Sequence, residues 1–110
     1  MHIWAAIEDE KTMLGRLGNA LLKLPVMFID IELKNGKKWT FKFSSPPARN
    51  GFLLSPQIKS VHEMRDFLRD GLERAPGRRV VTAIRIRQAD SPFSPLVRRP
   101  VRVAFYSLQR

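Results

Sequence analysis

The sequence predicts a β-rich α+β fold with antiparallel pairing, as one sheet or a small jelly-roll-like β-sandwich of about five or more strands with two helices. Residues 26–43 alternate apolar and polar side chains around Asn35 and Gly36, the strongest local signal for a β-hairpin. Residues 79–87 and 97–108 alternate in the same way. No strand–helix–strand rhythm typical of a parallel sheet occurs.

Length and composition indicate a single domain. The chain has 110 residues and no cysteine, so its core must hold together without disulfides. We expect a helical segment over residues 1–25 and a β-rich core over residues 26–110. No apolar run approaches the roughly 20 residues of a membrane-spanning helix. The opening residues lack the basic, apolar and small-residue order of an export signal.

Two helices are expected, one on each side of the hairpin. Residues 12–24 carry apolar side chains at helical spacing, with Thr12 as a candidate N-cap and Pro25 as the stop. Ser60 is the expected N-cap of the second helix, and Glu63 completes a capping box. The apolar stripe of the second helix consists of Val61, Met64, Phe67, Leu68 and Leu72.

The register of the hairpin follows from the side chains that must share a face. A two-residue loop would place Ile31 opposite Thr40 and leave no continuous apolar face. A three-residue loop, residues 34–36 with Gly36 at positive φ, instead pairs Ile31 with Trp39. We predict this bulged register, with Trp39 in the core and not exposed as a sugar-binding platform. The inner face then carries Ile29, Ile31, Trp39 and Phe41.

Three further strands are expected after the hairpin. Residues 52–54 form a brief strand that ends at Ser55 and Pro56. In residues 79–87 the side chains expected to share one face are Val80, Thr82, Ile84 and Ile86, with the isoleucines inward. In residues 97–108 the expected inward side chains are Val101, Val103 and Phe105.

The positive charge is concentrated near the C-terminus and suggests an anionic partner. The formal net charge is +10, and residues 74–110 carry nine arginines against the single acid Asp90. If the last two strands pair, one outer face gathers Arg85, Arg87, Arg102 and Tyr106. Such a patch suits a phosphate, an anionic sugar or a lipid headgroup, and nucleic acid less well. The alternative is a solvated strand surface.

No pattern of catalytic residues is present, so we expect no enzymatic activity, cofactor or metal. The chain has no phosphate-binding glycine loop and no nucleophile elbow. His62, Asp66 and Asp70 are spaced four apart like metal ligands, but a solvated helix face is the preferred interpretation. Asp30 and Glu32 share a face of the hairpin with two lysines that offset their charge.

One stretch of core and turn residues resembles a known family. Gly51-Phe52-Leu53-Leu54-Ser55-Pro56, then Ile58 and Phe67, and the closing Val-Arg-Val-Ala-Phe-Tyr are similar to the soluble C-terminal β-domains of some bacterial polytopic membrane proteins. Those domains resemble galactose-binding-like jelly rolls. The resemblance covers residues 51–108, about half of the chain, and transfers no catalytic or ligand-binding residue.

The resemblance implies a non-enzymatic accessory or ligand-binding β-domain within a larger parent protein. It implies a place on the extracytoplasmic face of a bacterial membrane. The candidate partners are carbohydrate or an anionic lipid surface, the second because of the arginine-rich strand face. A cytoplasmic location stays open. The alternative function is a basic anion-binding module that recognises nucleic acid or acidic lipid headgroups through the arginine-rich strand face.

Overall fold

The computed structural model describes residues 3–7, 28–43, 52–73, 77–88, 98 and 100–107. These ranges contain six strands and one helix. The strands are β1 (Ile3–Ile7), β2 (Phe28–Leu33), β3 (Lys38–Phe43), β4 (Phe52–Pro56), β5 (Gly77–Arg87) and β6 (Val101–Ser107). The helix is α2 (Val61–Asp70). The first expected helix, over residues 12–24, lies outside the described residues. The expectation of a helical segment over residues 1–25 is wrong at Ile3–Ile7, which form the strand β1.

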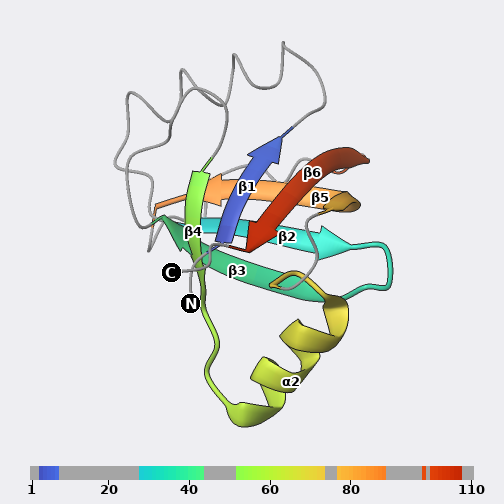
Figure 1. The fold of residues 1–110 in the computed structure, drawn as a ribbon. Helices are drawn as coiled ribbons and strands as arrows, with labels where there is room; N and C mark the ends of the chain where they lie inside the picture. The colour runs from blue at the N-terminus through green and yellow to red at the C-terminus, as the bar shows by residue number, and fades with distance from the viewer. Residues whose placement is uncertain are drawn as a thin grey trace.

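The six strands form a closed antiparallel barrel in the order β1-β4-β3-β2-β5-β6 (Figure 1). β1 pairs with both β4 and β6, so it joins the two ends of what would otherwise be an open sheet. The prediction of a β-rich antiparallel domain is confirmed, but the jelly-roll-like sandwich is wrong. Closure leaves one interior, which side chains from all six strands can fill.

The β2–β3 hairpin has the predicted bulged register. Ile31 lies opposite Trp39, and the loop residue Gly36 has a φ of 84°. The Leu33 carbonyl accepts a hydrogen bond from the Gly36 amide at 2.9 Å, and the Leu33 amide donates to the Lys37 carbonyl at 2.8 Å. The hairpin therefore presents one apolar face to the barrel interior and one polar face outward.

A β-bulge at Thr82 reverses the two faces of β5. The ladder between β2 and β5 skips this residue, and its Oγ1 donates a 3.1 Å hydrogen bond to the Glu32 carbonyl. Because one extra residue exchanges inside for outside, Val81 is fully buried and Val80 is 46% exposed. The predicted alternation, which placed Val80 with the inward isoleucines, is wrong on the N-terminal side of the bulge.

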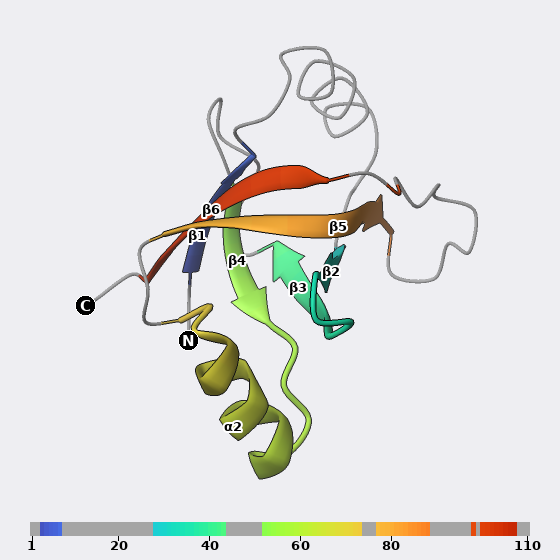
Figure 2. The same ribbon diagram turned by 90° about the vertical axis from the view of Figure 1, so that its right-hand side faces the viewer.

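Helix α2 covers one mouth of the barrel, as Figures 1 and 2 both show. Ser60 is its N-cap, and the Ser60 hydroxyl accepts a hydrogen bond from the Glu63 amide at 3.1 Å, as predicted. The Glu63 carboxylate accepts from the amide of Lys59, one residue before the position that a capping box uses. Gly71 ends the helix with a φ of 74° and donates to the Leu68 carbonyl.

The core joins the barrel interior to one face of α2. Phe67 is fully buried, and its ring packs edge-to-face on Trp39 with centroids 5.3 Å apart. Phe41 lies between Phe67 and Phe105, with centroid distances of 6.2 and 6.0 Å. Val61, which the sequence placed on the same stripe, is 70% exposed. Within the described ranges, no helix combines the length and apolar character that crossing a membrane requires.

Candidate functional site

Two of the predicted anion-binding arginines lie beside an acid. Arg85 is opposite Asp30 in the ladder between β2 and β5, and Arg87 is two residues further along. The Arg87 Nε donates a 2.6 Å hydrogen bond to Asp30 Oδ2, and its guanidinium carbon lies 4.9 Å from the centre of the Phe28 ring. Thr40 Oγ1 donates to the same carboxylate at 2.7 Å. Asp30 therefore neutralises Arg87 and holds it in place.

The other two predicted residues lie elsewhere on the barrel. Arg102 is opposite Val80, where β5 pairs with β6, and Tyr106 is opposite Trp4 of β1. Val80 and Arg85 are five residues apart on β5, roughly 16 Å at about 3.3 Å per residue. β5 and β6 pair as expected, but Arg102 and Tyr106 are themselves four residues apart on β6, roughly 13 Å at about 3.3 Å per residue, so the four residues do not form one cluster. Anion binding by these residues stays a prediction.

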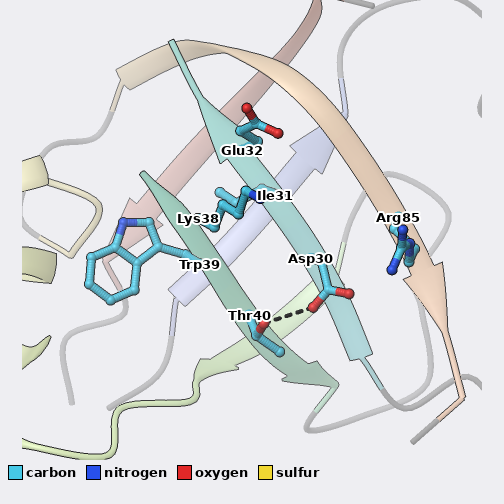
Figure 3. A pocket seen from close by; sticks show the side chains of 7 residues that line it. All are labelled: Asp30, Ile31, Glu32, Lys38, Trp39, Thr40 and Arg85. Atoms are coloured by element: carbon cyan, nitrogen blue, oxygen red, sulfur yellow. Dashed lines mark hydrogen bonds between the residues drawn. The ribbon is translucent and has the colours of Figure 1, made fainter. Parts of the chain in front are cut away.

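The first candidate site is a small groove on the outer face of β3, β2 and β5, which we call the sheet-face groove (Figure 3). Its volume is about 190 Å³, below the roughly 300–1,000 Å³ of typical ligand pockets. Figure 3 shows Asp30 and Glu32 of the central strand between Lys38 on one side and Arg85 on the other. These acids offset the bases, so the expected arginine-rich face is a surface of mixed charge.

The second candidate site is larger and lies where the β2–β3 loop, the end of α2 and the start of β5 meet. We call it the loop–helix groove. Its volume is about 450 Å³, within the range of typical ligand pockets. It is lined by Leu33, Lys34, Asn35, Arg69, Asp70, Arg79 and Val80. Three bases against one acid give this lining a net charge of +2.

Arg79 is the least exposed of the three bases that line the loop–helix groove. Its Nη2 lies 2.5 Å from the place where a Cβ on Gly71 would stand, so a larger residue there would displace the end of this flexible side chain. The guanidinium thus lies beside the C-terminal end of α2, where the helix dipole favours a cation. Its Nε is buried without a hydrogen-bond acceptor, and no acid in the described ranges pairs with it.

The acid of the loop–helix groove is held by the barrel. Trp39 Nε1 donates a 2.7 Å hydrogen bond to Asp70 Oδ2. Trp39 itself is 7% exposed, so its predicted place in the core is confirmed. This hydrogen bond keeps the Asp70 carboxylate at the barrel mouth.

The expectation that Asp66 and Asp70 lie on a solvated helix face is wrong, because both carboxylates interact with the hairpin. Asp66 Oδ2 accepts from Lys37 Nζ at 3.1 Å, and Asp66 Oδ1 lies 3.1 Å from Arg69 Nη2. The hydrogen bond from Lys37 holds the pKa of Asp66 below its ordinary value of 3.8. Nowhere in the described ranges do three His, Cys, Asp or Glu side chains gather as metal ligands would.

Sequence reasoning missed the loop–helix groove because its bases come from three separate elements. Lys34 lies in the hairpin loop, Arg69 in the last turn of α2 and Arg79 near the start of β5. The only local signal was a base next to the Asn-Gly turn. Arg102, one of the predicted residues, lies opposite Val80 at the wall of this groove.

No protein-family model matches the chain, and no curated protein or solved structure is significantly similar to it. The resemblance to the C-terminal β-domains of bacterial membrane proteins therefore stays a prediction.

Proposed function

We propose that this barrel is a non-enzymatic ligand-binding domain that binds an anionic group in the loop–helix groove. Arg79 supports this function most directly, because its side chain lines the groove and no described acid pairs with it. Lys34 is exposed on the facing loop and can close on the same anion. A guanidinium and an ammonium suit carboxylate and phosphate oxygens.

The electrostatic energies expected at this groove indicate weak binding that depends on the salt concentration. At an effective dielectric constant of about 20, one cation about 4 Å from an anion contributes roughly 4 kcal/mol before desolvation and ordering are subtracted. Salt screens the exposed Lys34 more than the half-buried Arg79. We expect a dissociation constant on the order of 0.1–1 mM for inorganic phosphate.

The loop–helix groove supports this function better than the sheet-face groove does. The sheet-face groove is less than half as large, and its two acids, Asp30 and Glu32, balance its two bases, Lys38 and Arg85. A bound anion there would lie next to two carboxylates and meet no net positive charge, which costs free energy. Charge and size therefore both select the loop–helix groove.

The wider setting of the domain stays part of the proposal. The resemblance of residues 51–108 supports an accessory role in a larger bacterial membrane protein, on its extracytoplasmic face. Carbohydrate binding has less support, because Trp39 is buried and offers no platform for a sugar. Nucleic acid also has less support, because the exposed Tyr106 does not line the groove where a base would stack.

A phosphate titration by isothermal calorimetry tests the site. The double variant Lys34→Ala/Arg79→Gln removes two charges from the groove, and we expect it to weaken phosphate binding by about tenfold or more. The matched control Lys38→Ala/Lys42→Ala removes two charges from the outer face of β3. We expect that control to stay within about twofold of the wild type. Equal losses in the two variants would show that only the net charge matters, and would refute the site.

A further inference from the structure

We infer, on the basis of the anion site proposed above, that the ligand of the loop–helix groove is an alkyl phosphate, an amphiphile whose apolar chain lies on Val80. Three large apolar side chains are exposed among the described residues, namely Val61, Val80 and Tyr106. Val80 is the one that lines the loop–helix groove, where it adjoins Arg79 in the chain.

The bulge at Thr82 is the reason that Val80 faces outward. Without the extra residue, Val80 would share the inner face of β5 with Ile84, and Val81 would be turned out. The structure buries Val81 instead and leaves Val80 as part of the groove wall. The bulge thus places an apolar side chain next to the cation that binds the anion, an arrangement that bulges often provide near functional sites.

An apolar chain on Val80 would strengthen binding without any new charge. Burying one methylene group corresponds to about a fourfold gain in affinity. Leu33 also lines the groove, but it is only 7% exposed, so the apolar contact depends on Val80. A phosphate between Lys34 and Arg79 can extend its alkyl chain along Val80, whereas a purely polar anion leaves this side chain in contact with water.

The test compares inorganic phosphate with butyl phosphate by calorimetry at one ionic strength. For the wild type we expect butyl phosphate to bind about tenfold more tightly than inorganic phosphate. In Val80→Ser we expect the ratio of the two affinities, each measured on that variant, to fall below about threefold. The matched control Val61→Ser removes a more exposed valine far from the groove and should keep the wild-type ratio.

The outcomes separate this inference from the proposed function. Equal affinities for the two phosphates in the wild type would overturn the inference that the ligand carries an alkyl chain, and would leave the anion site intact. Failure of both phosphates to bind would overturn the anion site itself. A wild-type ratio that persists in Val80→Ser would also overturn the role of Val80.

An alkyl phosphate can be a lipid headgroup in a bilayer or a soluble molecule, and binding to vesicles distinguishes these two sources. Vesicles that contain phosphatidic acid in phosphatidylcholine present the group in a bilayer, and phosphatidylcholine vesicles are the control. Binding to the acidic vesicles that butyl phosphate displaces, and that Val80→Ser weakens, supports a lipid headgroup as the source. Tight binding of butyl phosphate without binding to these vesicles supports a soluble alkyl phosphate.

Discussion

Trp39 Nε1 donates a 2.7 Å hydrogen bond to Asp70 Oδ2, and this bond joins the β-hairpin to the last turn of α2. The same indole packs edge-to-face on Phe67, so one side chain contributes both a polar and an apolar contact between barrel and helix. The loop–helix groove depends on this junction, because α2 supplies one of its walls.

Replacing Trp39 by Phe tests the hydrogen bond in this junction. The ring can still pack on Phe67, but the partner of the Asp70 carboxylate is lost. We expect a loss of about 1–2 kcal/mol in the free energy of unfolding, because the site is only partly buried. Urea denaturation measures it. If the hydrogen bond is responsible, Asp70→Ala combined with Trp39→Phe will cost less than the sum of the two single changes.

Replacing Phe67 by Ala tests whether α2 is part of the core. Phe67 is fully buried against Trp39 and Phe41, so we expect a loss of about 3–5 kcal/mol in the free energy of unfolding. Val61→Ala is the control in the same helix, and we expect it to stay within about 0.5 kcal/mol of the wild type. Denaturant unfolding curves that coincide for the two variants would contradict this role of the helix.

Gly36 and Gly71 both have a positive φ, but only Gly71 lies next to Arg79. Alanine substitutions at the two positions therefore distinguish the effect of backbone strain from the effect of displacing the Arg79 side chain. A Cβ at Gly71 meets the Arg79 guanidinium, whereas a Cβ at Gly36 meets nothing within 4 Å. We expect both Gly71→Ala and Gly36→Ala to cost about 1–3 kcal/mol of stability through strain. Only Gly71→Ala should also weaken phosphate binding, by about threefold or more. Equal phosphate affinities in the two variants would show that phosphate binding does not depend on the position of the Arg79 guanidinium beside Gly71.

The ion pairs of Asp66 lead us to expect a stability difference between the wild type and Asp66→Asn that depends on pH. In the folded protein the pKa of the Asp66 carboxyl lies below its ordinary value of 3.8. The ionised carboxylate therefore contributes its full share of the folding stability above pH 3.8, and this share is lost as the pH falls through the lower folded pKa. The difference in unfolding free energy between wild type and Asp66→Asn should therefore hold steady from pH 7 to about pH 5 and shrink below about pH 4. Urea denaturation at each pH measures it, and a difference unchanged down to pH 2 would contradict the ion pairs.

Local signals were enough to predict the hairpin and the helix cap. The Asn-Gly turn and the alternation around it determine the pairing of Ile31 with Trp39 over a short stretch of chain. Ser60 and Glu63 act within a single helical turn. In such cases the residues that interact are also close in the sequence, so the local sequence pattern is enough to predict the interaction.

Contacts between distant segments could not be predicted in the same way. Residues 79–87 alternate without a break, and only the pairing of β5 with both β2 and β6 places a bulge at Thr82. Barrel closure likewise depends on β1 meeting β6 from the opposite end of the chain. The loop–helix groove brings together Lys34 and Arg79, which are 45 positions apart. No local pattern specifies such a meeting.

An NMR titration of the ¹⁵N-labelled chain with inorganic phosphate tests the central claim most directly, because it locates binding residue by residue. We predict the largest amide shift changes at residues 34–36, 69–71 and 79–80, with saturation in the millimolar range or below. Largest changes at Arg85, Arg87, Arg102 and Tyr106, or shifts spread over every basic surface, would contradict an anion site in the loop–helix groove.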